Sequence, residues 1–100
     1  MQKDYLVALD EFCAMHNVEI SFIRSLQENG LIRITNVEEK GFIDTDQLGE
    51  VEKYILFYYD LEINIGGIET ITHLLQRIKG MQEEITTLKN RLLLYESWFF

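Results

Sequence analysis

Between Ile71 and Phe99, apolar residues recur at alternating intervals of three and four positions. This spacing places them all on one side of an α-helix, and over several repeats it predicts the seam of a coiled coil. We therefore expect a long helix over about residues 67–97 that pairs with a second helix. The seam consists of Ile71, Leu74, Ile78, Met81, Ile85, Leu88, Leu92, Tyr95 and Phe99.

The residues on and beside this seam indicate what the second helix is. The seam alternates between two heptad positions, with mostly isoleucine at the first and leucine or methionine at the second. This combination favours a coiled coil of two parallel helices. In a parallel pair of identical helices, Glu84 of each helix faces Lys89 of the other. Arg91 faces Glu96 in the same way, so both flanking contacts are attractive. We expect a homodimer whose dimerisation residues are those of the seam up to Leu92.

The residues before the seam have the pattern of a small helical domain with one extended segment. Apolar residues at helical spacing predict helices over about 6–16, 19–29 and 46–60. Residues 31–43 alternate apolar and polar around a polar tip at 36–41, which predicts a short β-hairpin, or wing. We therefore predict a mainly α fold, in which residues 1–65 form a winged helix-turn-helix domain and residues 66–100 a C-terminal coiled-coil helix.

Glycine and asparagine provide the turn signals, because the chain contains no proline. Asn17 suits a left-handed conformation between the first two helices. Gly30 suits the position just after the second helix. The pair Gly66-Gly67 is expected to interrupt the chain before the last helix.

The net charge of −8 is concentrated before the seam. Residues 1–60 hold twelve of the seventeen acidic residues and five of the nine basic residues. An acidic surface repels nucleic-acid phosphates and attracts basic protein surfaces, so DNA is not the expected partner. The single Cys13 suits a reducing cytoplasm. The chain also lacks an apolar run of about 18 residues, so we expect no membrane span.

Two groups of residues are candidates for contact with a partner protein, and we expect them to form one docking surface. One group is acidic and lies at and after the hairpin tip, where solvated or helix-capping carboxylates are the alternative. The other is a pair of adjacent tyrosines late in the third helix, where packing in the core is the alternative. The predicted partner-binding residues are Glu38, Glu39, Asp44, Asp46, Tyr58 and Tyr59.

No group of residues predicts catalysis, a metal site or a cofactor site. Cys13 and His16 share a helix face, but a metal site needs three or four ligands, and His73 is the only other histidine or cysteine. Carboxylates at a wing tip lack the concave pocket of acid–base catalysis, and nucleotide-binding and nucleophile motifs do not occur. We expect a protein that is not an enzyme. The terminal run Trp98-Phe99-Phe100 fits either the end of the coiled coil or a partner contact.

Residues 17–31, NVEISFIRSLQENGL, resemble without gaps the helix-turn-helix core of the MerR-type family, whose pattern is roughly G-V-S-x-x-T-L-R-Y-Y-E-x-x-G-L. Gly41-Phe42 is similar to the Gly-Tyr of that family's wing, and Asp46 to Leu48 to the start of its next helix. The residues that match in kind are Asn17, Val18, Ile23, Arg24, Gly30 and Leu31.

The departures from that pattern affect the residues that contact DNA phosphates in the family. Ser25 and Leu26 replace the tyrosine pair, and Ile43 stands where an arginine is expected after the wing. Of the family's basic positions, Arg24 remains. The resemblance therefore implies the fold of a transcription regulator without its phosphate contacts.

The chain also resembles the CbpM-like chaperone modulators, which are short acidic proteins with a winged helix and a coiled coil. The similar segments are Glu11-Phe12-Cys13, Phe42-Ile43-Asp44, Asp60-Leu61-Glu62 and Gly67-Ile68. This resemblance implies binding to the J-domain of a DnaJ-like co-chaperone such as CbpA, which blocks its access to the Hsp70 chaperone DnaK. A J-domain presents a basic helix, which an acidic domain complements. The alternatives are a MerR-like regulator that binds DNA as a dimer and a structural adaptor.

Overall fold

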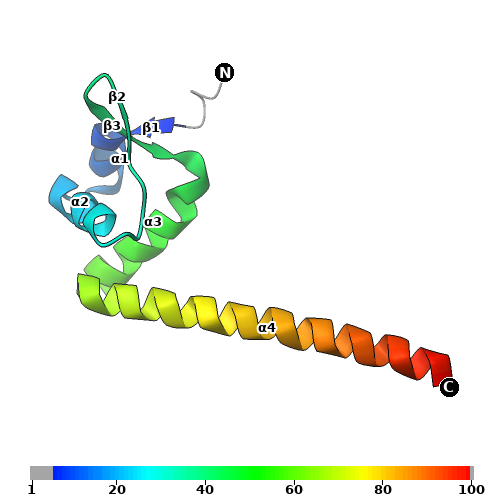
Figure 1. The fold of residues 1–100 in the computed structure, drawn as a ribbon. Helices are drawn as coiled ribbons and strands as arrows, with labels where there is room; N and C mark the ends of the chain where they lie inside the picture. Colours follow the sequence, from blue (N-terminus) through cyan, green and yellow to red (C-terminus); the bar gives the residue numbers. More distant parts are fainter. Residues whose placement is uncertain (1–5, 100) are drawn as a thin grey trace. The chain divides into compact units, whose positions relative to one another are not determined.

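The computed structural model of the chain describes residues 6–99 (Figure 1). Its mainly helical architecture, with a small sheet and a long C-terminal helix, confirms the predicted fold class. Among these residues, no helix combines the length and the apolar character that a membrane crossing would need. The elements are β1 (Leu6–Ala8), α1 (Leu9–His16), α2 (Ile20–Glu28), β2 (Thr35–Val37), β3 (Lys40–Asp44), the 3-10 turn η2 (Thr45–Gln47), α3 (Leu48–Ile55), the π-helical turn η3 (Leu56–Asp60) and α4 (Ile65–Phe99).

The described chain divides into two compact units, which we call the head and the tail. The head ends at Glu69 and the tail begins at Thr70. This boundary lies within α4, a little after the predicted domain boundary between residues 65 and 66. The first turn of α4 therefore belongs to the head.

The sheet contains one strand more than the predicted hairpin. β3 lies in the centre and pairs antiparallel with β1 on one side and β2 on the other. In the first of these pairs Leu6 lies opposite Asp44, and Ala8 opposite Phe42. The prediction that a helix begins near residue 6 is therefore wrong, because pairing with β3 satisfies the backbone groups of these residues in an extended conformation.

The helices α1 and α2 form the helix-turn-helix, and left-handed residues end them at the two positions that the sequence predicts. Asn17 follows α1 with φ 56°, and Gly30 follows α2 with φ 75°. The Gly30 N–H donates to the carbonyl of Gln27 at 2.9 Å. The N–H of the next residue, Leu31, donates to the Leu26 carbonyl, also at 2.9 Å. These two bonds form a Schellman motif, which ends a helix and turns the chain away from its axis.

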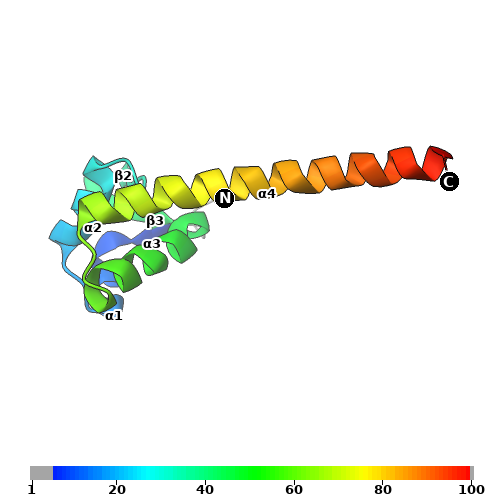
Figure 2. The ribbon, with the colours of Figure 1, turned by 90° about the horizontal axis from the view of Figure 1, so that it is seen from below.

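The hydrophobic core of the head draws on each of its helices and on β3, and Figures 1 and 2 show α1, α2 and α3 gathered around the sheet. In β3 the buried residue is Ile43, while Phe42 is only partly buried. Neighbouring residues of a strand point to opposite faces, so only one of the two can enter the core. The core residues are Leu9, Phe12, Cys13, Phe22, Ile23, Leu26, Ile32, Ile43, Val51, Tyr54 and Ile68.

The predicted third helix contains three kinds of helical turn. Its α-helical part ends at Ile55 and continues as the π-helical turn η3. Tyr54 is buried, and in a regular α-helix Tyr58 would lie on the same face. A π turn adds a residue and rotates the residues after it, so Tyr58 lies at the surface, 38% exposed. Tyr58 therefore does not join the buried core, which was the alternative to its predicted role in partner binding.

The break before the last helix lies earlier than the two glycines that we expected to form it. Glu62 adopts φ 56°, and α4 begins at Ile65. The side-chain Oδ1 of Asn64 accepts a hydrogen bond from the Gly67 N–H at 2.7 Å, which is the contact of an N-cap. A Cβ added at Gly67 would lie 2.7 Å from Cγ2 of Ile63. Gly67 therefore permits a close approach between the first turn of α4 and the residue Ile63 that precedes it.

Candidate partner-binding surfaces

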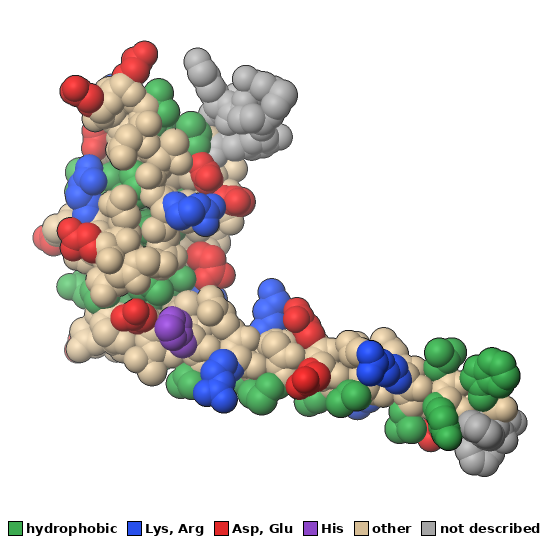
Figure 3. All heavy atoms as spheres, viewed as in Figure 1, with side chains coloured by type: hydrophobic (Ala, Val, Ile, Leu, Met, Phe, Trp, Pro, Cys, Tyr) green, Lys and Arg blue, Asp and Glu red, His purple; other side chains and the backbone are tan. Residues whose placement is uncertain are grey.

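The tip of the wing is a two-residue turn formed by Glu38 and Glu39. Their φ values are 51° and 67°, and the turn joins the last strand pair, Val37 with Lys40. Two successive left-handed residues are the geometry of a type I′ turn, which suits asparagine and glycine better than glutamate. Both glutamates are exposed, and acidic side chains project from the hairpin end of the head in Figure 3. The tip therefore presents two carboxylates to solvent.

The other two predicted acids, Asp44 and Asp46, lie beside a base. Nη2 of Arg33 is 3.9 Å from Oδ2 of Asp44 and 4.0 Å from Oδ2 of Asp46. Arg33 is held by the buried side chain of Gln47, which accepts a hydrogen bond from its N–H and donates one to its carbonyl, both at 2.8 Å. The ion pairs are exposed and weak, but the guanidinium offsets part of the acidic charge here.

A hollow of about 230 Å³ lies between the start of α1, the helix α2 and the wing. It brings together two basic residues: Arg24 of α2, which matches the MerR-type pattern, and Lys40 of the wing. Three carboxylates share the same space, so the local charge is negative and opposes the approach of phosphate. The charged residues of its lining are Arg24, Lys40, Asp10, Glu11 and Glu39.

Tyr58 and Tyr59 lie in η3 and pack against α2. Their ring centroids are 5.0 Å apart, edge to face, and lie 4.4 and 5.3 Å from the ring of Phe22. The Tyr59 hydroxyl accepts a hydrogen bond from the N–H of Glu19, the residue before α2, at 3.2 Å. Both tyrosines nevertheless remain more than a third exposed. The two rings are thus fixed by neighbours and accessible to a partner.

The structure does not bring the acidic and the aromatic candidates together. Figure 1 places the β2–β3 hairpin at the top of the head and η3, between α3 and α4, at its bottom. The expectation of one surface that includes both groups is therefore wrong. The intervening helices and sheet separate them, which their positions in the sequence did not reveal.

Cys13 and His16 have separate surroundings. Cys13 is buried, and this burial, reinforced by the carboxylate of Asp10, raises the pKa of its thiol above the ordinary value. His16 is partly exposed, with Nε2 3.9 Å from Oε2 of Glu52. Among residues 6–99, no group of three histidine, cysteine, aspartate or glutamate side chains is placed to hold a metal ion.

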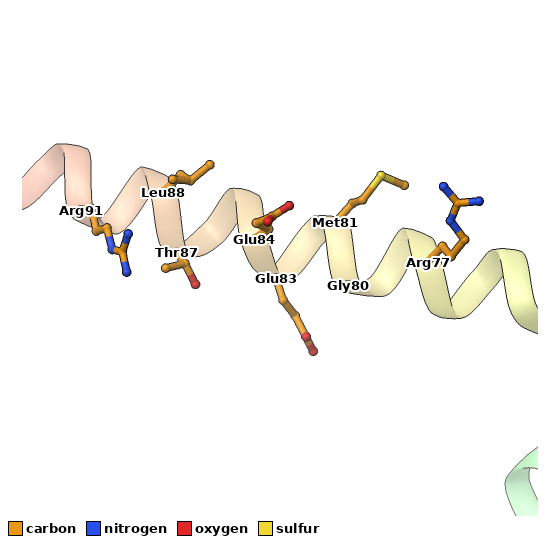
Figure 4. A pocket seen from close by; sticks show the side chains of 8 residues that line it. All are labelled: Arg77, Gly80, Met81, Glu83, Glu84, Thr87, Leu88 and Arg91. Carbon is orange, nitrogen blue, oxygen red and sulfur yellow. The ribbon is translucent and has the colours of Figure 1, made fainter.

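The seam residues of the tail form an apolar stripe along α4, visible in Figure 3. From Leu74 to Leu92 they are 45 to 56% exposed, whereas Ile71 is partly buried. In Figure 4, Met81 and Leu88 point to one side of the helix and Glu83 and Thr87 to the other. All the residues around the hollow in this view belong to α4, so it is open surface beside the stripe rather than an enclosed site.

The apolar end of the tail extends beyond the seam. Trp98 is 81% exposed, and Leu93 and Leu94 are exposed as well. Phe100, the last residue of the terminal aromatic run, lies outside the described residues. The two interpretations of this run, coiled-coil packing and partner contact, both remain predictions.

Sequence reasoning missed the roles of Arg33 and Gln47. Their hydrogen bonds join residues fourteen positions apart, which no local periodicity reports. The predicted hairpin did contain a signal for the ion pair, because a hairpin brings its two ends together. Arg33 precedes its first strand and Asp44 ends its second.

Comparison with known proteins gives a family match over most of the chain. The family described as MerR HTH family regulatory protein matches residues 7–90. The match spans the helix-turn-helix, the wing, α3 and the larger part of α4. No curated protein and no solved structure matches the chain.

Proposed function

The chain belongs to the MerR HTH family of regulatory proteins, and within this family we propose that it is a chaperone modulator of the CbpM type. In this proposal it acts in the cytoplasm as a binding protein, not as an enzyme. Its partner is the J-domain of a DnaJ- or CbpA-like co-chaperone, which it keeps from the Hsp70 chaperone. Family membership alone suits a DNA-binding regulator equally well, so the preference for a chaperone modulator rests on the charge of the head.

The observation that carries the proposal is the acidity of the face between α2 and the wing. In a winged helix-turn-helix that reads DNA, the second helix enters the major groove, and lysine and arginine side chains contact the phosphates around it. Here Arg24 and Lys40 share that face with three carboxylates. A protein that neutralises about six to ten phosphates needs a comparable number of bases, which this face does not offer.

The wing supports the same conclusion. Its tip carries Glu38 and Glu39, both exposed, at a position where a DNA-binding wing would approach the phosphate backbone. Carboxylates there repel DNA and attract lysine or arginine on a protein. A J-domain, with its basic helix, is a partner of the matching charge.

A transcription regulator of the MerR type is the second candidate. It is favoured by the family description and by Arg24 and Lys40, which lie on the same hollow between α2 and the wing. A dimer would double these bases and place two heads on one duplex. The three carboxylates of the hollow are doubled equally, so the dimer does not reverse the sign of the charge.

In both candidates the tail holds two copies of the chain together. A helix that stays in water has no need of a continuous apolar stripe. This tail has one, made of half-exposed isoleucine, leucine and methionine at the spacing of a coiled-coil seam. We propose a homodimer formed through this stripe.

Two binding measurements on the full-length protein at near-physiological salt test the proposal. Calorimetric titration with the J-domain of a CbpA-like co-chaperone should show saturable binding. Gel shifts with genomic duplex fragments should show only weak association that does not depend on the DNA sequence. A sequence-specific duplex complex below micromolar Kd, without J-domain binding, would establish the second candidate instead.

A charge variant tests whether the acidity of the hollow is what prevents DNA binding. Replacing Asp10, Glu11 and Glu39 with Asn, Gln and Gln should tighten non-specific duplex binding and steepen its salt dependence, because three repulsive charges are removed. The matched control replaces three exposed carboxylates outside the hollow, Glu28, Glu52 and Glu83, with Gln. If both triple variants bind duplex DNA equally, total charge and not the hollow is responsible.

A further inference from the structure

An exposed apolar surface lies at the end of the head opposite the wing. It consists of Tyr58, Tyr59, Ile20 and Leu61, and we call it the tyrosine patch. These residues are 38, 39, 40 and 57% exposed. Ile20 follows Glu19, whose N–H donates to the Tyr59 hydroxyl, so α2 and η3 contribute to the same surface.

The two rings of this patch are fixed before any partner binds. Both rest on the buried Phe22, and the Tyr59 hydroxyl is held by the backbone of Glu19. In a regular α-helix, adjacent residues point about 100° apart. Tyr58 and Tyr59 are adjacent residues of the π-helical turn η3, yet both contact the ring of Phe22 in α2. Aromatic side chains that lose little freedom on binding make effective anchors.

Three exposed carboxylates surround the tyrosine patch. Glu19 precedes Ile20, while Asp60 and Glu62 stand on either side of Leu61. The ion pairs formed among residues 6–99 do not include these three acids, whereas Asp44 and Asp46 both face Arg33. The charge around the patch is therefore negative and less compensated than that beside the wing.

We propose that the tyrosine patch anchors a basic amphipathic helix of the partner. The apolar side of that helix covers Tyr58 and Tyr59, and its lysine or arginine residues lie against Glu19, Asp60 and Glu62. This proposal rests on the proposed function in one respect, namely that the basic helix belongs to a J-domain. The wing acids then act at a distance, by attracting a basic partner, and do not form the contact.

The charges favour this occupant over a second copy of the chain. Two tyrosine patches placed face to face would bring six carboxylates together, and like charges across an interface oppose association. A basic helix instead pairs each carboxylate with an opposite charge. Its apolar side also removes the exposed tyrosine and leucine surface from water.

Rate measurements on the full-length protein and the J-domain test the location of the anchor. Tyr58→Ala should weaken binding about tenfold or more, mainly by faster dissociation, because it removes an aromatic anchor. Asp60→Asn with Glu62→Asn should slow association a few-fold and flatten its salt dependence. Asparagine keeps the left-handed conformation at position 62 accessible.

Two controls separate this effect from unfolding and from general charge. Glu38→Gln with Glu39→Gln removes the same charge at the wing and should change the affinity less than about twofold. Tyr59→Phe keeps the ring but loses the bond to Glu19, so it should retain most of the affinity. Circular dichroism of each variant should match that of the parent protein.

The outcomes distinguish this proposal from the proposed function. If the J-domain binds and the wing pair weakens it while Tyr58→Ala does not, the proposed function stands and the tyrosine patch is not the anchor. If the J-domain does not bind at all, the proposed function fails. A helical peptide of lysine and leucine, compared with one of lysine and serine, then serves as the probe.

Selective binding of the leucine peptide that Tyr58→Ala abolishes would support the patch. Binding that Tyr58→Ala leaves unchanged, or no selective binding, would overturn it. Sedimentation of the free protein checks the remaining occupant. A loss of self-association in Tyr58→Ala would show that a second copy covers the patch and would also overturn the proposal.

Discussion

Left-handed backbone conformations occur at five of the described residues, and each ends an element or turns a hairpin. Asn17 and Gly30 end the two helices of the helix-turn-helix, Glu62 follows η3, and Glu38 and Glu39 form the wing tip. At Gly30 glycine is needed for its backbone conformation alone, because a Cβ there would meet nothing within 4 Å. The loss of folding free energy on substituting this residue therefore measures the strain of the left-handed backbone alone.

Gly30→Ala should destabilise the head by about 1–2 kcal/mol, since alanine is strained at φ 75°. Gly49→Ala provides the matched comparison. Gly49 lies within α3, where an added Cβ would also meet open space, so alanine should stabilise by about 0.5–1 kcal/mol. Urea denaturation followed by circular dichroism measures both. Equal effects of the two substitutions would contradict the assigned conformations.

At the scale of single elements, the wing hairpin places two glutamates in a turn conformation that does not favour them. Replacing Glu38-Glu39 with Asn-Gly should stabilise the hairpin by about 1 kcal/mol or more, because these residues favour a type I′ turn. Amide exchange in β2 and β3 reports the change. Glu38→Gln with Glu39→Gln removes the same charges without changing the backbone preference. A similar gain in that control would show that charge repulsion, not backbone strain, limits the stability of the turn.

The tail helix provides the second test at this scale. Ile78→Lys with Ile85→Lys places charges in the middle of the seam, and burying them in a dimer is strongly unfavourable. Sedimentation should show monomers, or loss of the folded state by circular dichroism. Gln76→Lys with Asn90→Lys adds the same charge away from the seam and should leave the dimer intact. If the seam variant sediments like the parent protein, the assignment of the dimer interface is wrong.

At the scale of the whole molecule, α4 serves two units. Ile68, in its first turns, is fully buried in the head core, whereas Ile78 of the tail is 45% exposed. Ile68→Ala should therefore cost the head about 2–4 kcal/mol through lost burial and the cavity it leaves. Ile78→Ala is the comparison, and it should affect dimerisation more than the fold of the head. Denaturation of the head and sedimentation of the dimer, measured together, separate the two roles.

The family match is likewise a property of the whole chain. It covers both the head and most of the tail, so the long helix is part of the family's plan and not an added segment. The partner, the dimer and the absence of catalysis stay predictions. Titration with the J-domain and sedimentation of the seam variant address the first two.

The helical faces and the helix ends of the helix-turn-helix follow from the sequence alone. The inward residues of α1 and α2, such as Leu9, Phe12 and Ile23, follow from a period of 3.6 residues, which any helix must obey. Asn17 and Gly30 were equally predictable, because a left-handed helix end depends on the residue at that position. The apolar stripe of the tail is a local property of the same kind.

The features that join distant parts of the chain depend instead on tertiary packing. Leu6–Ala8 form a strand because β3 is available to pair with them. The sequence of these three residues alone does not indicate that pairing. Tyr58 reaches the surface through a π-helical turn, and the tyrosines lie far from the wing acids. Periodicity describes how neighbours along one element are arranged. Which elements meet, and which side chains remain exposed when they do, depends on packing between residues that the sequence keeps apart.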